Sequence, residues 1–83
     1  MHLELYYYNA CPFCRMVLHT IDLLGIQDKI VMKDIMSHRA YSAELRELNG
    51  HTQVPCLVID GKPMLESSDI NDFLNDNFRP SSN

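Results

Sequence analysis

Apolar residues in the first third of the chain repeat at two different spacings. Over residues 2–8, Leu3, Leu5 and Tyr7 alternate with their neighbours, which is typical of a strand. Asn9-Ala10 interrupt this pattern, and Pro12 suits the first turn of a helix. Apolar residues then recur at helical spacing until Gly25, a typical helix end; they are Cys14, Val17, Leu18, Ile21 and Leu24.

The middle of the chain combines short apolar runs with one amphipathic segment. Residues 30–32 and 56–59 are continuous apolar runs, which predict strands buried on both faces. Between them, Ser37 could cap a helix that ends at Asn49-Gly50. Its apolar face would consist of Tyr41, Leu45 and Leu48.

The last third predicts a hairpin followed by a helix. Asp60-Gly61 is a strong two-residue turn signal leading into residues 63–65. Ser67 or Ser68 could cap a final helix whose inward face would consist of Ile70, Phe73, Leu74 and Phe78.

The order strand-helix-strand-helix-strand-strand-helix predicts one α/β domain over residues 1–83. A helix between each early pair of strands implies crossover connections and parallel pairing, closed by an antiparallel hairpin. We therefore expect a four-stranded mixed sheet flanked by three helices.

Composition and charge exclude several classes of protein. The chain has 83 residues, of which 46% are apolar and 22% charged, as expected for one globular domain. Seven Lys and Arg against eleven Asp and Glu give a net charge of −4, which argues against nucleic acid as a partner. No apolar run approaches the roughly 20 residues that cross a membrane. Residues 1–4 lack the positive region of a signal peptide, so we expect a cytoplasmic protein that binds no membrane.

Two of the three cysteines form the motif Cys-Pro-Phe-Cys, at the predicted junction of strand and helix. There the free backbone N–H groups of Phe13 and Cys14 would point toward the Cys11 sulfur and stabilise its thiolate. Cys14 lies on the apolar stripe, so we expect it to be buried and Cys11 to be exposed. Cys11 would then attack a disulfide and Cys14 would resolve the product.

Other uses of these cysteines are open. A Cys-x2-Cys pair can be half of a zinc site, but His51 and Cys56 fit no common zinc spacing, so no metal ligand is assigned. The pair could also be inert core residues. Cys56 itself is expected to be a small buried apolar residue, with a second redox role as the alternative.

Val54-Pro55 directly precedes the predicted strand at residues 56–59. Because proline cannot donate to the ladder, Pro55 must stand at the start of the strand. A cis bond there would turn the N–H and C=O of Val54 outward, where an extended peptide could pair with them. A trans proline that simply begins the strand is the alternative.

Glu66-Ser67-Ser68-Asp69 opens the last predicted helix. The free N–H groups of its first turn would suit a carboxylate, and Asp69 could accept a hydrogen bond from an ammonium group. Plain helix capping explains the same residues equally well.

These segments, in this order, resemble the glutaredoxin family. The resemblance implies a thioredoxin-like fold and glutathione-dependent disulfide reduction, with Cys11 as nucleophile and Cys14 as resolving thiol. It identifies Val54 as the partner of the glutathione backbone, Ser68 and Asp69 as ligands of the γ-glutamyl end, and Arg39 as the candidate for the glycyl carboxylate. The implied glutathione-binding set is Cys11, Phe13, Arg39, Gln53, Val54, Pro55, Ser67, Ser68 and Asp69.

Some positions depart from the glutaredoxin pattern. Tyr8 stands where these proteins commonly have lysine. Gln53-Val54-Pro55 and Glu66-Ser67-Ser68 look instead like the N-terminal domain of glutathione transferases, which also binds glutathione. A transferase would need a second, helical domain, and we expect 83 residues to be too few to hold one.

We therefore expect a monomeric glutathione-dependent thiol–disulfide oxidoreductase. Glutathione would be its co-substrate, and disulfide-bearing or glutathionylated proteins its partners. One alternative is a dimer that holds a [2Fe–2S] cluster between two Cys11 thiolates and two glutathiones. Another is a redox-inert adaptor that binds a carboxylate peptide and leaves the pKa of Cys11 at its ordinary value.

Overall fold

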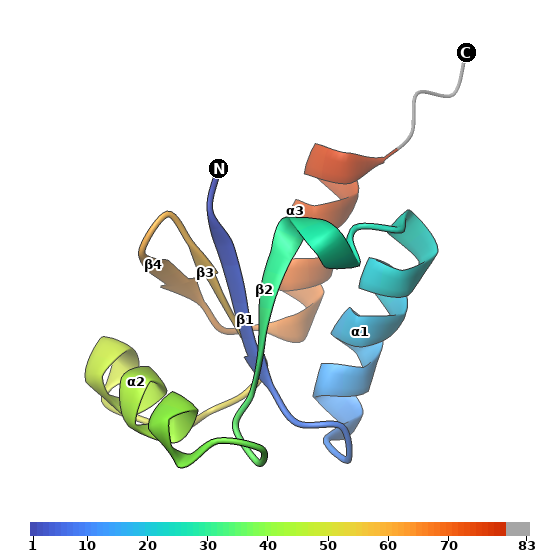
Figure 1. Ribbon diagram of the computed structural model, residues 1–83. Coiled ribbons are helices and arrows are strands. Elements are labelled where there is room, and N and C mark those ends of the chain that lie inside the picture. Colours follow the sequence, from blue (N-terminus) through green and yellow to red (C-terminus); the bar gives the residue numbers. More distant parts are fainter. Residues whose placement is uncertain (80–83) are drawn as a thin grey trace.

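The computed structural model describes residues 1–79, and Figure 1 shows the arrangement of its elements. The predicted four strands and three helices are confirmed, and a short 3-10 helix is added. Within residues 1–79, no helix is long and apolar enough to span a membrane. The elements are β1 (Leu3–Tyr7), α1 (Pro12–Leu24), η1 (Gln27–Lys29), β2 (Ile30–Asp34), α2 (Arg39–Asn49), β3 (Cys56–Ile59), β4 (Lys62–Met64) and α3 (Ser67–Phe78).

The sheet is mixed, with the strand order β2-β1-β3-β4. β1 pairs parallel with β2, whereas β3 is antiparallel to both β1 and β4. The expectation that α2 would connect parallel strands is therefore wrong. α2 lies at the lower end of the sheet, where β2 finishes, and does not run back along the strands (Figure 1). The chain consequently enters β3 from that same end and runs in the opposite direction.

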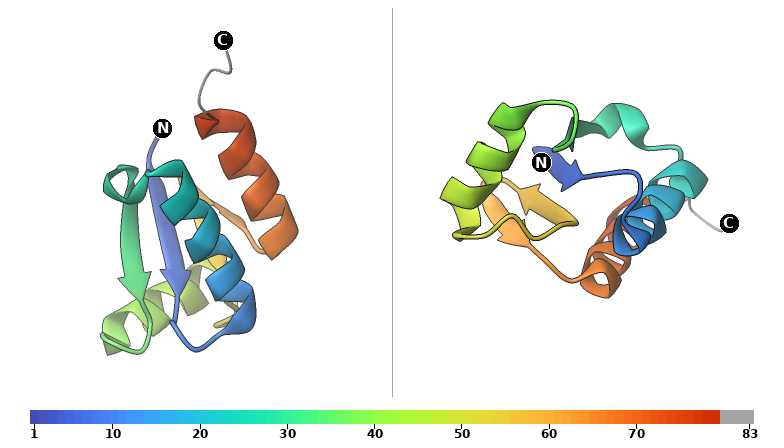
Figure 2. Two further views of the ribbon diagram at one scale, coloured as in Figure 1. Left: turned by 90° about the vertical axis from the view of Figure 1, so that its right-hand side faces the viewer. Right: turned by 90° about the horizontal axis from the view of Figure 1, so that it is seen from below.

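Helices cover both faces of the sheet. α1 and α3 lie side by side on one face, and α2 lies on the other (Figure 2). Because side chains alternate along a strand, Leu3 and Leu5 of β1 face α1 and α3, whereas Tyr6 faces α2. Two apolar cores result. The core beneath α2, called here the α2 core, consists of Tyr6, Leu45, Cys56 and Val58.

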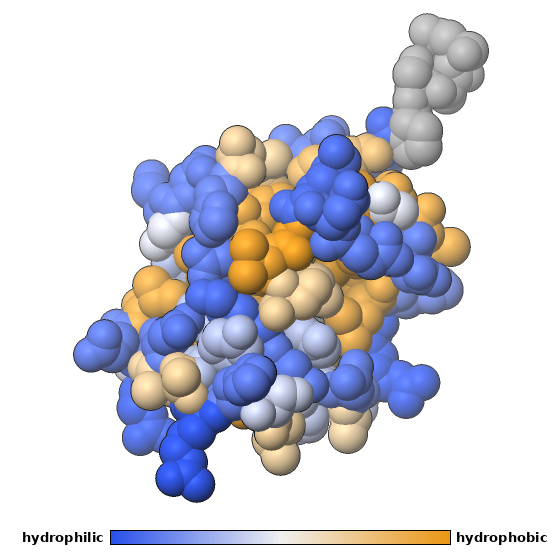
Figure 3. All heavy atoms as spheres, in the orientation of Figure 1, coloured by the Kyte–Doolittle hydropathy of each residue, from blue (hydrophilic) through white to orange (hydrophobic). Residues whose placement is uncertain are grey.

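The position of each strand in the sheet decides how deeply it is buried. Cys56, Leu57 and Val58 of β3 are buried, as predicted for an internal strand. β2 is an edge strand instead, and its Val31 is 44% exposed, so the prediction that residues 30–32 are buried on both faces is wrong. Figure 3 shows an apolar patch over this edge strand. A short apolar run does not by itself reveal which strand will lie at an edge.

The turn signals predicted the hairpin but not the starts of the helices. Asp60 and Gly61 both adopt positive φ, 49° and 88°, as a two-residue hairpin turn requires. The predicted serine caps are wrong, because the residues in the capping positions of α2 and α3 are His38 and Glu66. Neither makes a side-chain capping hydrogen bond, and Ser67 is already helical.

Candidate active site

Three segments that are far apart in the sequence line one groove. Phe13 comes from the start of α1, Val54-Pro55 from the loop before β3, and Ser67 from the start of α3. The groove has a volume of about 140 Å³ and is lined by Phe13, Gln53, Val54, Pro55, Leu65, Glu66 and Ser67. The structure therefore brings together residues from all three segments singled out in the sequence.

Cys11 occupies the capping position of α1, two residues before Phe13, and does not itself line the groove. Burial of the thiol opposes its ionisation, but hydrogen bonds to the sulfur outweigh this effect and lower the pKa of Cys11 below its ordinary value. The backbone N–H groups of Cys14 and Phe13, together with the side chains of Cys14 and Tyr8, favour the thiolate, although the Cys11 side chain makes no capping hydrogen bond to the first turn of α1. The sequence predicted this thiolate stabilisation by backbone N–H groups.

The exposure of Cys11 differs from the expectation. The residue is only 7% exposed, so the prediction of an exposed thiol is wrong in degree. Cys14 and Cys56 have no exposed surface, so Cys11 is still the most accessible of the three cysteines.

The other two thiols are held in the protonated form. Burial, together with the neighbouring Cys11, raises the pKa of Cys14 to about 12. Burial also raises the pKa of Cys56 to about 11. Cys56 belongs to the α2 core, as expected for a small apolar residue. Of the three thiols, Cys11 therefore ionises most readily and is the best nucleophile.

Unpaired backbone groups occur in two of the segments that line the groove, the Val54-Pro55 loop and the first turn of α3. The Val54–Pro55 peptide bond is cis. Among residues 1–79, the N–H and C=O of Val54 have no hydrogen-bond partner, and neither do the N–H groups of Ser67, Ser68 and Asp69 in the first turn of α3. Backbone donors and an acceptor are thus available for an extended ligand with a carboxylate at one end.

Not every residue in the implied binding set lines the groove. Phe13 is 60% exposed and lines the groove, as do Gln53, Val54, Pro55 and Ser67. Ser68 and Asp69 follow Ser67 in the first turn of α3 and are exposed without lining the groove. Arg39 opens α2 and borders other surface hollows, beside Ser42. The structure therefore does not bring Arg39 into the groove.

One contact in the site was missed by the sequence reasoning. The side chain of Tyr8 forms a hydrogen bond with Cys11 that lowers the pKa of the thiol. The available signal was the presence of Tyr8 at the position where glutaredoxins commonly have lysine. Within residues 1–79, no group of three or more His, Cys, Asp or Glu side chains is arranged to hold a metal ion.

Comparison with known proteins supports a relationship to glutathione transferases. The family model described as the N-terminal domain of glutathione S-transferase matches residues 5–82. A delta-class glutathione transferase from Nilaparvata lugens superposes with a TM-score of 0.73 at 28% identity, over 95% of this chain and 37% of its own. A β-etherase from Sphingobium superposes with a TM-score of 0.76, also at 28% identity, over 100% of this chain and 34% of its own.

A third similar structure is an unclassified glutathione S-transferase from Bombyx mori, with a TM-score of 0.79 at 22% identity, over 98% of this chain and 38% of its own. The chain thus spans little more than a third of the length of these three structures. No curated protein matches the chain.

Proposed function

Because the chain belongs to the family of glutathione S-transferase N-terminal domains, we propose that it binds glutathione in the groove between α1, the Val54-Pro55 loop and α3. This family match corrects the expectation of a glutaredoxin, a family that shares the thioredoxin-like fold. The segments Gln53-Val54-Pro55 and Glu66-Ser67-Ser68 had already indicated a glutathione transferase domain.

In this proposal, glutathione lies extended across the groove. Its backbone pairs with the free N–H and C=O of Val54. Its γ-glutamyl carboxylate accepts hydrogen bonds from the first-turn N–H groups of α3, and Asp69 accepts one from its ammonium group. Arg39 is the proposed partner of the glycyl carboxylate, although it lies outside the groove lining and would have to reach across.

We further propose that the chain catalyses thiol–disulfide exchange through Cys11. The single observation that carries this proposal is the lowered pKa of Cys11 at the start of α1, where Phe13 lines the groove. The Cys11 thiolate attacks the glutathione sulfur of a mixed disulfide, a Cys11–glutathione disulfide forms, and the substrate leaves as a thiolate that takes up a proton. A second glutathione thiolate then attacks this disulfide, releasing oxidised glutathione and restoring the Cys11 thiolate.

Glutathione, rather than Cys14, is the main resolving thiol in this scheme. A thiol with a pKa of about 12 is almost fully protonated at neutral pH, so Cys14 is a slow nucleophile. Formation of the mixed disulfide removes the charge on Cys11 that helps to raise this pKa, but Cys14 stays buried. Closure of a Cys11–Cys14 disulfide is therefore the slower route.

A glutathione transferase activity is the second candidate, favoured by the family and by the similar structures. The N–H groups that stabilise the Cys11 thiolate could equally stabilise the thiolate of a bound glutathione for attack on an electrophile. The two activities differ in what Cys11 does. It forms a covalent disulfide in the first, and only lies beside the glutathione sulfur in the second.

Parallel assays on the same preparation test the proposal. We expect glutathione-coupled reduction of a mixed disulfide to be fast, and conjugation of glutathione to an electrophilic halonitroarene to be slow or absent. A thioredoxin-reductase-coupled assay serves as the control. Conjugation without disulfide reduction would establish the transferase, and activity only with thioredoxin reductase would refute glutathione as the reductant.

A further inference from the structure

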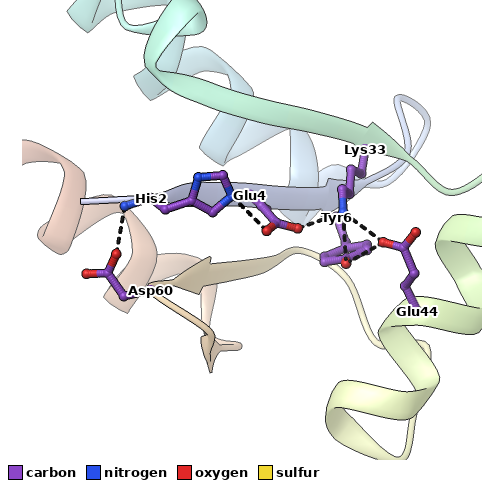
Figure 4. Close-up of polar contacts among 6 residues, drawn as sticks. All are labelled: His2, Glu4, Tyr6, Lys33, Glu44 and Asp60. Carbon is purple, nitrogen blue, oxygen red and sulfur yellow. Dashed lines mark hydrogen bonds and ion pairs between the residues drawn. The ribbon is translucent and has the colours of Figure 1, made fainter.

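A polar cluster on the α2 face of the sheet joins β1, β2 and α2 (Figure 4). The Nζ atom of Lys33 lies 2.6 Å from Oε1 of Glu4 and 2.7 Å from Oε1 of Glu44. The hydroxyl of Tyr6 donates to the same oxygen of Glu44 at 2.9 Å, and accepts from Lys33 at 3.4 Å. One ammonium group thus joins a carboxylate of β1, a carboxylate of α2 and a buried phenol.

This cluster differs from an ordinary pair of surface charges. Lys33 is only 16% exposed and Tyr6 is 1% exposed, whereas Glu44, their partner on α2, is 44% exposed. The ammonium group of Lys33 also lies over two aromatic rings, 5.2 Å from the centre of Tyr6 and 5.6 Å from that of Tyr41. Partly buried, hydrogen-bonded ion pairs hold their partners more firmly than exposed ones do. We therefore take Lys33 as the main polar attachment of α2 to the sheet.

The cluster is connected to the groove through the α2 core. Tyr6 belongs to this core together with Leu45 of α2. Val54 and Leu65, which form part of the groove lining, pack against the same core. The chain also runs directly from the end of α2, Asn49, into the loop that carries Val54. The position of α2 therefore influences the wall of the groove.

We propose that Lys33 is a positioning residue for ligand binding, because it fixes α2 and the α2 core on which Val54 and Leu65 rest. Lys33 does not line the groove and would not touch the ligand. This inference rests on the proposed binding of glutathione. In this inference, the affinity of the groove for glutathione depends in part on the α2 face of the sheet. The reactivity of Cys11 depends instead on the start of α1.

The test compares four variants with the wild type, using glutathione as the probe. Lys33→Met removes the ammonium group, and Lys33→Arg restores a positive charge. Tyr6→Phe removes the hydroxyl but keeps the ring in the core, so it provides a folded variant if Lys33→Met does not fold. Lys29→Met, at an exposed position of η1 outside the cluster, removes the same charge and is the matched control.

The readouts are the KM for glutathione, kcat, and the pH profile of Cys11 alkylation. We expect Lys33→Met and Tyr6→Phe to raise KM by about three- to tenfold with kcat and the alkylation profile unchanged, and Lys33→Arg to restore most of the binding. Lys29→Met should match the wild type. An unchanged KM in both Lys33→Met and Tyr6→Phe, or an equal rise in Lys29→Met, would overturn the inference. A wild type that neither binds nor uses glutathione would instead refute the proposed function.

Discussion

Cys11 and Cys14 lie within one helical turn and have opposite acid–base properties. The N–H groups at the start of α1 lower the pKa of Cys11 despite its burial, whereas burial raises the pKa of Cys14 to about 12. The hydrogen bond between the two side chains favours the charge on Cys11 and disfavours it on Cys14. Cys11 is therefore the more reactive nucleophile, and Cys14 stays a protonated thiol.

The first prediction concerns the reactivity of Cys11 as a function of pH. Because the thiolate is the reacting form, the rate of alkylation by iodoacetamide should rise with pH and reach half its maximum below the ordinary thiol value of 9.0. Tyr8→Phe should move this midpoint to higher pH, since it removes a hydrogen bond to the thiolate. Mass spectrometry identifies the alkylated residue. A midpoint at or above 9.0 would contradict the proposed activation.

The second prediction concerns Asp69 in the first turn of α3. If its carboxylate accepts a hydrogen bond from the ammonium group of glutathione, Asp69→Asn should weaken binding by about tenfold or more. Isothermal titration calorimetry measures the Kd. Asp72→Asn, an exposed site on the same helix, is the control and should bind as the wild type does. Equal affinities in the two variants would remove Asp69 from the site.

The third prediction concerns the buried Cys56 thiol. Its pKa is raised from 9.0 to about 11 by burial, so ionisation is less favourable in the folded state than in the unfolded state. Its contribution to stability is therefore intact below pH 9 and is lost as the pH rises through about 11, at a cost of about 2–3 kcal/mol. In Cys56→Ala, the free energy of unfolding should therefore fall less steeply between pH 9 and pH 11 than in the wild type.

Urea unfolding at several pH values measures the effect. Val58→Ala, at a buried position of the same strand, is the control. It should lower the free energy of unfolding at every pH but retain the wild-type alkaline slope. The same slope in both variants would mean that Cys56 ionises equally easily in the folded and unfolded states.

The fourth prediction concerns the N-terminus of α2. His38 occupies the capping position with extended φ and ψ, and its side chain makes no capping hydrogen bond. An aspartate there could accept from a free N–H group and complement the helix dipole, so His38→Asp should stabilise the fold by about 0.5–1 kcal/mol. The gain is reduced by loss of the edge-on contact with Tyr41. Thermal unfolding measures it, and His51→Asp, outside any helix, should give no gain.

Local patterns predicted much of the fold and of the site. Three predictions depended on a few adjacent residues each. Cys-Pro-Phe-Cys stands at the start of a helix, Val54–Pro55 is cis, and Asp60-Gly61 forms a turn with positive φ. The direction of β3 and the edge position of β2 depend on how distant segments pair, which no local pattern contains.

Sequence patterns also could not predict the side-chain environments that residues distant in the sequence form together. The local pattern around Cys11 indicated an exposed thiol, whereas the folded chain buries it. The Lys33 cluster joins residues that are 11 to 38 positions apart, with no repeat or motif to mark them. The family itself was indicated only by departures from the glutaredoxin pattern, at Gln53 and Glu66.

The most direct test of the account is to measure the reduction of a glutathionylated protein by Cys11→Ser and Cys14→Ser side by side. We predict that Cys11→Ser loses all measurable activity, since no other thiol is prepared to attack, and that Cys14→Ser retains most of it, since glutathione resolves the intermediate. Equal activities in the two variants, or activity that survives loss of Cys11, would contradict the account.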